Sequence, residues 1–295
     1  MNITIVGAGA LGNMLATKLS DNNNIELIVK PENLDLISKK EISFKEIKGE
    51  IVKKNIEIKT DIGETDLLII CVKSYDVKGI LLNIKDKETP ILCCQNGLHT
   101  LNYMLKKFDR NKLSYLVTGN GMSKVKPGIS EHKGIGFTYV GELNGEKSQR
   151  IEYIANELTN NGMTCDVVDN IIEYIWLKAI INSAINPIAT IAGIRNGQLK
   201  NSEHYIKLEK ICNESINIAK KKGIHLPLDP WSEINSIIEK TSENKCSMLQ
   251  DIENKQETEI CAINGELIKI AKKLSIDSTY NQQVFSDIEN LSVYS

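Results

Sequence analysis

The sequence has no excess of charge of one sign, because 36 lysines and arginines stand against 38 aspartates and glutamates in 295 residues. The two signs are mixed along the chain, which predicts no basic surface for a nucleic acid or an anionic membrane. A long apolar run is also missing, since the longest, residues 67–72, is far too short to span a bilayer. With no basic, apolar leader at the start, we expect a soluble, cytoplasmic protein.

Cysteine and histidine occur without a ligand or redox pattern. The seven cysteines include no Cys-x-x-Cys pair and lie mostly in apolar stretches, as reduced core residues of a cytosolic protein do. The four histidines, His99, His132, His204 and His225, belong to no motif. We therefore expect no metal site and no thiol chemistry.

The first half of the chain alternates short β-type runs with helical patterns. The four clearest runs are residues 3–6, 25–29, 67–72 and 91–94. Such alternation predicts parallel strands joined by crossover helices. Weaker strands at 113–118, 136–140 and 164–168, with a helix at 152–160, complete this part.

Helical patterns dominate from residue 171 onward. They cover residues 171–192, 203–222, 231–238, a short stretch around Met248, and 260–273. A chain of this length favours two cores. We predict an α/β protein with an N-terminal Rossmann-type parallel sheet domain over residues 1–168 and a C-terminal all-α domain over 169–295. Two domains leave a cleft between them, and because no Pro/Gly-rich linker separates them, we expect them to share a substantial interface.

A glycine motif, Gly7-Ala8-Gly9-Ala10-Leu11-Gly12, follows the first strand directly and opens a helix. Gly7 suits a tight turn, Gly9 permits a pyrophosphate to approach the backbone, and Gly12 permits close helix packing. The helix N-terminus adds N–H groups and positive dipole. This strand-to-helix context predicts dinucleotide binding, with a glycine-rich structural turn as the alternative.

The residue after the second strand bears on the choice of dinucleotide. An NAD site favours an acidic residue there, whereas this chain has Lys30, which suits a 2′-phosphate. NADPH is therefore favoured, although Glu32 nearby leaves NADH open. Lys73 and Asn96 follow the third and fourth strands, where α/β sheets place ligand contacts, and are further cofactor candidates. The alternative for Asn96-Gly97 is a simple turn dipeptide, which the pair taken alone favours.

Lys178, Asn182 and Asn186 recur every fourth residue in an otherwise apolar helical segment. At about 100° per residue, the three polar side chains emerge along one helix edge. A buried ammonium needs a partner that two amides cannot supply, which indicates an anionic or carbonyl-bearing ligand. The alternative is a lysine that extends to water beside two structural asparagines.

Ser247 and Glu259 form a second polar pair. They lie twelve residues apart and would point about 120° away from each other on one continuous helix. They can converge only if the polar stretch 253–257 breaks the helix. We expect that break, with Thr258 capping the next helix.

The chain resembles the ketopantoate reductase (2-dehydropantoate 2-reductase) family nearly end to end. The motifs that carry the resemblance are Gly-x-Gly-Ala-Leu-Gly at 7–12, Val-Lys-x-Tyr at 72–75, Gln-Asn-Gly at 95–97, Trp-x-Lys-x-x-x-Asn-x-x-x-Asn-Pro at 176–187, Asn-Gly-x-Leu at 196–199, Ser-Met-Leu-Gln-Asp at 247–251, Thr-Glu-Ile at 258–260 and Ile-Asn-Gly at 263–265.

This resemblance implies reduction of ketopantoate to pantoate by NADPH, in pantothenate and coenzyme A biosynthesis. Lys178 would be the general acid, and Glu259 would border the nicotinamide ribose and the reacting carbonyl. The substrate ligands would be Asn96, Asn182, Asn186, Asn196 and Ser247. Lys73 and Asn96 would contact the cofactor. The family commonly has arginine where this chain has Lys30, which loosens the expected preference for NADPH over NADH.

Three alternatives stay open. The first is a reductase of another branched 2-oxo acid or of an imine, because the shape of the cleft decides the substrate. An opine dehydrogenase would need a catalytic histidine, which no motif supplies. A protein that senses NADPH without turnover would not need the polar set around Lys178.

The sequence leaves the oligomeric state open between a monomer and a homodimer.

Overall fold

The computed structural model describes residues 1–37, 41–84 and 88–293. The chain divides into two compact units. We call Met1–Gln95 with Met104–Ile171 the sheet unit, and Asn96–Tyr103 with Ile172–Ser295 the helical unit. The predicted boundary at residue 168 kept Asn96–Tyr103 with the sheet, whereas the structure groups this segment with the helices.

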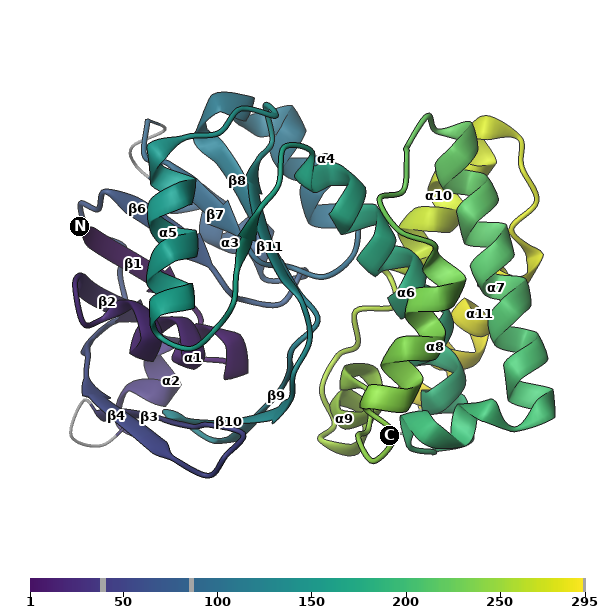
Figure 1. Ribbon diagram of the computed structural model, residues 1–295, viewed down its shortest axis with the longest axis horizontal. Coiled ribbons are helices and arrows are strands. Elements are labelled where there is room, and N and C mark those ends of the chain that lie inside the picture. The colour runs from purple at the N-terminus through teal and green to yellow at the C-terminus, as the bar shows by residue number, and fades with distance from the viewer. Residues whose placement is uncertain (38–40, 85–87, 294–295) are drawn as a thin grey trace. The chain divides into compact units, whose positions relative to one another are not determined.

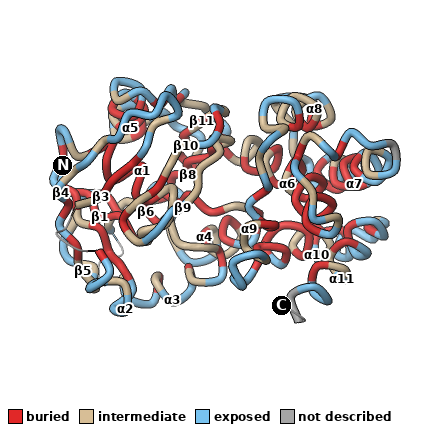
Figure 2. The backbone as a smooth tube through the Cα atoms, turned by 90° about the horizontal axis from the view of Figure 1, so that it is seen from below, coloured by how far each residue is buried: buried red, intermediate tan, exposed pale blue. Residues whose placement is uncertain are grey.

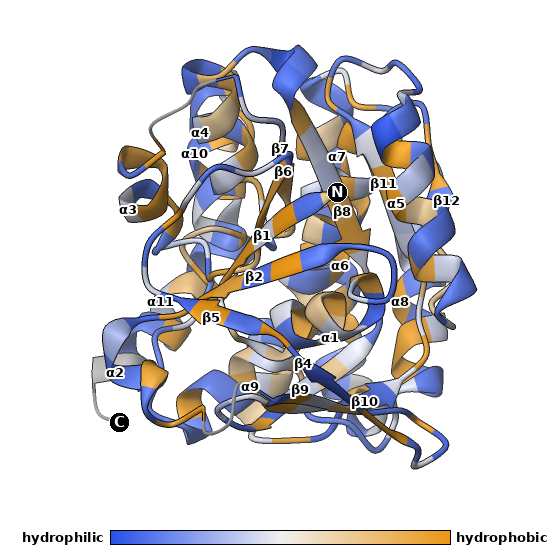
Figure 3. Cartoon of the chain, turned by 90° about the vertical axis from the view of Figure 1, so that its left-hand side faces the viewer, coloured by the Kyte–Doolittle hydropathy of each residue, from blue (hydrophilic) through white to orange (hydrophobic). Residues whose placement is uncertain are grey.

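In the sheet unit, eight strands form one sheet in the order β12-β11-β8-β7-β6-β1-β2-β5. All neighbours are parallel except β8 and β11. Helices α1 (Ala10–Leu19) and α5 (Gln149–Asn160) cover one face and α3 (Val77–Leu82) the other (Figures 1 and 3). This architecture confirms the predicted Rossmann-type sheet. Its strands are β1 (Asn2–Val6), β2 (Asn24–Ile28), β5 (Glu57–Lys59), β6 (Leu67–Ile70), β7 (Ile91–Cys93), β8 (Leu113–Thr118), β11 (Thr138–Glu142) and β12 (Asp166–Val167).

A second, four-stranded sheet in the same unit was not predicted. Its order is β4 (Ile51–Asn55), β3 (Glu41–Lys45), β10 (Ile129–Gly134) and β9 (Gly121–Lys126). All four strands contact α1, which also packs on β1 and β2 of the larger sheet. Because strands lie on both of its sides, α1 is buried from Gly12 to Leu19.

Two polar side chains hold α1 between these layers. Asn13 Nδ2 donates to Ser130 Oγ over 2.8 Å. Lys18 Nζ pairs with Glu46 Oε1 at 2.6 Å and also donates to the Asn161 carbonyl. The helix that begins at the glycine motif is therefore held by polar contacts in both its first and its second half.

The helical unit is built around α6 (Ile171–Ala192), which Figure 2 shows as largely buried. By length and a mean hydropathy of 1.3, α6 could cross a membrane, but 78% of its most apolar window is buried, as in the core helix of a soluble protein. The sequence of α6 contains no long apolar run, because Lys178 and several other polar residues interrupt it. The other helices in the described part of the chain are α2 (Pro31–Leu34), α4 (His99–Lys107), α7 (Ser202–Lys221), α8 (Pro230–Lys240), α9 (Ser247–Glu253), α10 (Asn264–Leu274) and α11 (Thr279–Val293), with 3₁₀ turns at Arg110–Lys112 and Asn196–Lys200.

The region after α9 differs from the expectation in detail. The predicted break is present, because α9 ends at Glu253 and α10 begins at Asn264. The capping role expected of Thr258 is wrong, since Ile263 is the residue that precedes α10. Glu259 instead accepts from the backbone N–H groups of Ala262 and Ile263 through its carbonyl. It therefore lies on a turn and not on a helix.

Candidate functional site

The turn from β1 to α1 requires glycine at two of its three motif positions for reasons within the protein. Gly7 has φ +110°, and a Cβ on it would lie 3.0 Å from the Val72 backbone nitrogen. A Cβ on Gly12 would lie 1.9 Å from the Gly7 carbonyl oxygen. These glycines let α1 start directly against the end of β6.

Gly9 is different, because a Cβ there would meet no protein atom within 4 Å. Gly9 is the residue before α1, and no described side chain caps that helix start. The first-turn N–H groups and the open space at Gly9 together suit a phosphate group. The described residues therefore fit the pyrophosphate of a dinucleotide.

The other predicted cofactor residues of the sheet unit lie at the same edge. Val6 pairs with Ile28 and with Ile70, so the carboxyl ends of β1, β2 and β6 meet there. Lys30 follows β2, and its Nζ lies 3.4 Å from Asp76 Oδ2. Lys73 follows β6, and its carbonyl accepts from the Asp76 backbone N–H over 3.0 Å.

Gln95, the first residue of the Gln-Asn-Gly motif, stabilises this edge through its side chain, a role that was not predicted. Its Nε2 donates to the carbonyls of Ile70, at 2.6 Å, and Val72, at 3.1 Å. Gln95 is 6% exposed. The side chain thus ties the end of β7 to the backbone that leads into Lys73.

In the helical unit, Lys178, Asn182 and Asn186 all lie on α6. Their spacing places them along one helix edge, as predicted. Lys178 and Asn182 are half-buried, and Asn186 is buried. The edge becomes more enclosed toward its C-terminal end.

Pro187 lies inside α6 and has no N–H to donate to the Ser183 carbonyl, four residues earlier. Asn264 Nδ2, from the first residue of α10, donates to that carbonyl over 2.9 Å. The same nitrogen also donates to Asn281 Oδ1 at 3.0 Å. Asn264 therefore donates to the carbonyl that Pro187 leaves without its helical donor, and it joins α10 to α6 at the residue after Asn182.

Asn96 and Glu259, both in the helical unit, are in direct contact. Asn96 Nδ2 donates to Glu259 Oε2 over 2.8 Å, and Glu259 is 5% exposed. Gly97 has φ +78°, and a Cβ on it would lie 2.3 Å from the Ala262 carbonyl oxygen. That oxygen accepts from the Leu98 backbone N–H at 2.9 Å. The Gln-Asn-Gly motif is thus a turn that docks on the Glu259 segment.

Asn196 begins a 3₁₀ turn and is 6% exposed. Its Nδ2 donates to Thr241 Oγ1 at 2.8 Å and its backbone N–H to the Asn244 carbonyl at 2.9 Å. Its Oδ1 is buried and has no hydrogen-bond partner among the described residues. An acceptor in that state suits a hydroxyl or amide donor from a ligand.

Ser247 is the exposed first residue of α9. Cys246, just before it, accepts from the Leu249 N–H and donates to the Asn186 carbonyl, with Sγ 3.5 Å from that oxygen. Burial raises the pKa of the Cys246 thiol. The seven cysteines are free thiols, and this one has a structural role as the cap that joins α9 to the Asn186 end of α6.

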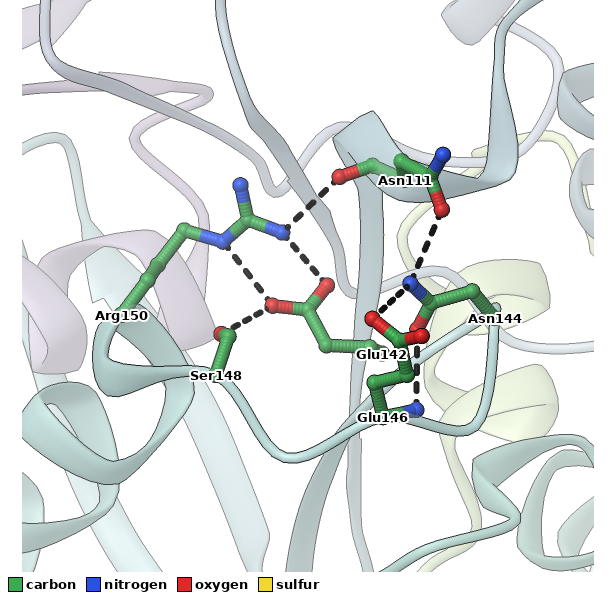
Figure 4. A pocket seen from close by; sticks show the side chains of 6 residues that line it. All are labelled: Asn111, Glu142, Asn144, Glu146, Ser148 and Arg150. Atoms are coloured by element: carbon green, nitrogen blue, oxygen red, sulfur yellow. Dashed lines mark hydrogen bonds and ion pairs between the residues drawn. The ribbon is translucent and has the colours of Figure 1, made fainter.

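A separate polar pocket of about 320 Å³ lies elsewhere in the sheet unit (Figure 4). Glu142 pairs there with Arg150 at 2.5 Å and accepts from Ser148. Glu142 is opposite Ser114 at the beginning of β8, so the pocket is at the amino ends of the parallel strands. It is therefore remote from the glycine motif, and its Glu142 and Arg150 side chains already pair with each other. The lining residues are Asn111, Glu142, Asn144, Glu146, Ser148 and Arg150.

No group of three histidine, cysteine, aspartate or glutamate residues within the described ranges could hold a metal ion. The predicted site residues of the helical unit supply one lysine, several amides, a hydroxyl and a buried carboxylate. Such a set can donate a proton and orient an oxygen-rich substrate.

Two family models match the chain: "Ketopantoate reductase PanE/ApbA" over residues 3–145, and "Ketopantoate reductase PanE/ApbA C terminal" over residues 170–291. The 2-dehydropantoate 2-reductase of Pyrococcus horikoshii is 31% identical over 287 residues, covering 95% of this chain and 94% of that protein. The enzyme of the same name from Archaeoglobus fulgidus is 29% identical, covering 96% and 95%.

Solved structures agree in fold. D-mandelate dehydrogenase with NADH and anilino(oxo)acetate has a TM-score of 0.90 at 25% identity, covering 100% of this chain and 99% of that one. A PanE/ApbA family ketopantoate reductase from Ralstonia eutropha JMP134 has a TM-score of 0.86 at 22% identity, with the same coverage.

Proposed function

Because this chain belongs to the ketopantoate reductase (2-dehydropantoate 2-reductase) family of oxidoreductases, we propose that it reduces 2-dehydropantoate to pantoate with NADPH. The reaction would supply pantothenate and coenzyme A biosynthesis. The observation that carries the proposal is the polar edge of α6, where Lys178, Asn182 and Asn186 stand in an apolar helix.

The glycine motif, Lys30, Lys73 and Asn96 are the residues that we assign to the dinucleotide. Gly9 and the uncapped start of α1 would hold the pyrophosphate, since a Cβ at Gly9 meets no protein atom. Lys30 would bind the 2′-phosphate as a point charge. A bound nicotinamide supplies the hydride that reduces the ketone carbon.

Lys178 is the proposed general acid. Negative charge develops on the carbonyl oxygen as the carbon is reduced, and an ammonium group stabilises and then protonates that oxygen. Lys178 is half-buried, which limits the access of water that would compete with its ammonium group for the carbonyl oxygen. Glu259, which accepts from Asn96, would keep the Asn96 amide oriented toward cofactor and substrate.

The amides and Ser247 would hold the rest of the substrate. Asn182 and Asn186, one and two helical turns from Lys178, would orient its hydroxyl and carbonyl oxygens, and Ser247 its carboxylate. Asn196 would accept from a substrate hydroxyl through Oδ1, which has no partner in the described part of the chain.

A second candidate is a reductase of a different 2-oxo acid. The similarity to D-mandelate dehydrogenase, at 25% identity and with NADH bound, supports this alternative. The shared chemistry would be hydride transfer to a 2-oxo acid, and the group beyond the keto carbon would differ.

One assay separates the candidates. Dinucleotide oxidation is followed with ketopantoate, phenylglyoxylate and aliphatic branched 2-oxo acids, each with NADPH and with NADH. The proposal expects the highest kcat/KM with ketopantoate and NADPH. A preference for phenylglyoxylate supports the second candidate. Tight dinucleotide binding without turnover of any 2-oxo acid would instead indicate a sensor.

A further inference from the structure

Lys30 and Asp76 form an ion pair at the edge of the sheet where the glycine motif lies. Lys30 Nζ is 3.4 Å from Asp76 Oδ2. The lysine side chain is 61% exposed and the aspartate side chain 33%. Both groups therefore remain accessible to a ligand that approaches from solvent.

The topology explains why these two residues meet. β1 lies between β6 and β2, and Val6 pairs with both Ile28 and Ile70. Lys30 follows the end of β2, and Asp76 lies beyond the end of β6. They are thus on either side of the strand that leads into the dinucleotide turn.

Local backbone bonds hold both residues in place. The Asp76 N–H donates to the Lys73 carbonyl at 3.0 Å, and the Asp76 carbonyl accepts from Ile80 in α3 at 3.3 Å. The Lys30 carbonyl accepts from the Asn33 N–H in α2 at 2.8 Å. The pair is therefore built on two anchored turns and does not depend on a free loop.

An NAD-binding Rossmann fold places its carboxylate at the end of the second strand, where it binds the ribose 2′-hydroxyl. In this chain the second strand ends in a cation, and the carboxylate comes from the far side of β1. A ligand at this edge meets one group that attracts a 2′-phosphate and one that repels it.

We propose that Asp76 is a specificity-determining residue that lowers the preference for NADPH over NADH. Its carboxylate competes with a 2′-phosphate for the Lys30 ammonium and repels that phosphate. With an unphosphorylated ribose, the same carboxylate accepts a hydrogen bond from the 2′-hydroxyl. The proposal rests on the dinucleotide site of the proposed function, and it is independent of which 2-oxo acid is reduced.

The test compares binding of NADP⁺ and NAD⁺, and of the fragments 2′,5′-ADP and 5′-AMP, by calorimetric titration. Asp76→Asn keeps the size of the side chain and removes its charge. We expect the ratio of Kd for NAD⁺ to Kd for NADP⁺ to rise about three- to tenfold, mainly through tighter NADP⁺ binding. The rise should shrink at high ionic strength, because both charges are exposed.

Asp169→Asn is the matched control. Asp169 pairs with Lys147 after β12, at the opposite edge of the sheet from β2, and its side chain is 73% exposed. This variant removes the same charge and should leave the Kd ratio unchanged. A Kd ratio that rises equally in both variants would reflect net charge and would overturn the proposal.

Lys30→Met tests the pair from its other side and is available if Asp76→Asn does not fold. It should weaken NADP⁺ binding by tenfold or more while NAD⁺ binding holds or tightens, because Asp76 is released to the 2′-hydroxyl. An unchanged ratio in Asp76→Asn, or equal losses for both dinucleotides in Lys30→Met, overturns the role of Asp76. If the unsubstituted protein binds neither dinucleotide, the proposed function itself fails.

Discussion

Asn264 Nδ2 donates a hydrogen bond over 2.9 Å to the carbonyl of Ser183, the helix carbonyl to which Pro187 cannot donate. Asn264 has no exposed surface. The contact joins α10 to α6 next to Asn182. A proline in the middle of a 22-residue helix is thereby tolerated, and the helix that carries Lys178 is fixed against its neighbour.

This relationship predicts a specific pattern of stability. Asn264→Ala should lower the free energy of unfolding by about 1–3 kcal/mol, since it leaves a buried carbonyl without its donor. A Pro187→Ala background restores a backbone N–H at position 187, and that group can donate to the Ser183 carbonyl. The same Asn264→Ala change should then cost about 1 kcal/mol less. Urea unfolding of the four proteins in this cycle measures the difference.

Asn254→Ala is a suitable control, because Asn254 follows α9, is exposed, and bonds only locally to the Gln250 carbonyl at 2.7 Å. It should show no coupling to Pro187. If Asn264→Ala lowers the free energy of unfolding equally with and without Pro187→Ala, Asn264 does not act through the Ser183 carbonyl.

The sequence was sufficient to predict the parts of the site that depend on local spacing. Residues 7–12 and the polar edge of α6 are local patterns, and the structure has both where they were expected. The family assignment drawn from these motifs is confirmed by the 31% identity to the Pyrococcus horikoshii enzyme. The break between Ser247 and Glu259 was also predicted, because its polarity is visible in the sequence.

The features that were missed depend on residues far apart in the chain. Asn264 and Ser183 are 81 residues apart, and neither side chain is unusual in its own segment. The strand Ile51–Asn55 is largely exposed, with two lysines, so its sequence lacks the apolar run of a buried strand. Its partner β3 pairs in turn with β10. The local sequence carries no information about that pairing. The contact of Lys30 with Asp76 likewise depends on the order of strands in the sheet.

The two glycines at the start of α1 should respond differently to alanine. Gly12→Ala should destabilise the protein strongly, by about 3 kcal/mol or more, because its Cβ would lie 1.9 Å from the Gly7 carbonyl oxygen. Gly9→Ala should keep its melting temperature within about 2 °C, since its Cβ meets no protein atom within 4 Å. The same Gly9→Ala protein should lose at least tenfold in affinity for NADP⁺ if Gly9 faces the pyrophosphate.

Thermal unfolding and dinucleotide titration of both variants make this comparison. Gly79→Ala serves as control, because a Cβ on Gly79 also meets no protein atom within 4 Å and Gly79 lies within α3. A Gly9→Ala protein that binds NADP⁺ normally would rule out close approach of a phosphate at that residue.

A buried thiol should govern part of the alkaline stability. Burial is the main cause that raises the pKa of Cys212, from 9.0 to about 12. Between these values the unfolded chain loses the thiol proton and the folded protein keeps it, so stability falls as pH rises. Cys212→Ala should make the decline of unfolding free energy between pH 9 and pH 12 shallower by about 1.4 kcal/mol per pH unit.

The slope is the informative quantity, because removing a buried side chain also lowers stability at every pH. Cys165, whose pKa is raised to about 12 mainly by burial, offers an independent repeat at a different place in the fold. Equal slopes in Cys212→Ala and the unsubstituted protein would mean that the folded thiol ionises near its ordinary pKa.

Lys178 should be required for turnover and not for binding of the dinucleotide. Lys178→Ala removes the proposed proton donor, and kcat should fall by about 10²- to 10⁴-fold. The Kd for NADPH should stay within about twofold, because the dinucleotide residues of the sheet unit are unchanged. Lys207→Ala, which removes an exposed lysine paired with Glu203 on α7, is the matched control and should keep normal kcat.

Rescue by a small amine distinguishes a proton donor from a structural residue. Alanine at position 178 leaves room beside a half-buried helix edge, so added ethylammonium can restore part of the lost kcat. Rescue should follow the concentration of the protonated amine and fail with a neutral molecule of similar size, such as propan-1-ol. Near-normal turnover in Lys178→Ala would remove Lys178 as the acid. A loss of kcat that no amine restores, together with weaker dinucleotide binding, would assign it to the structure of α6.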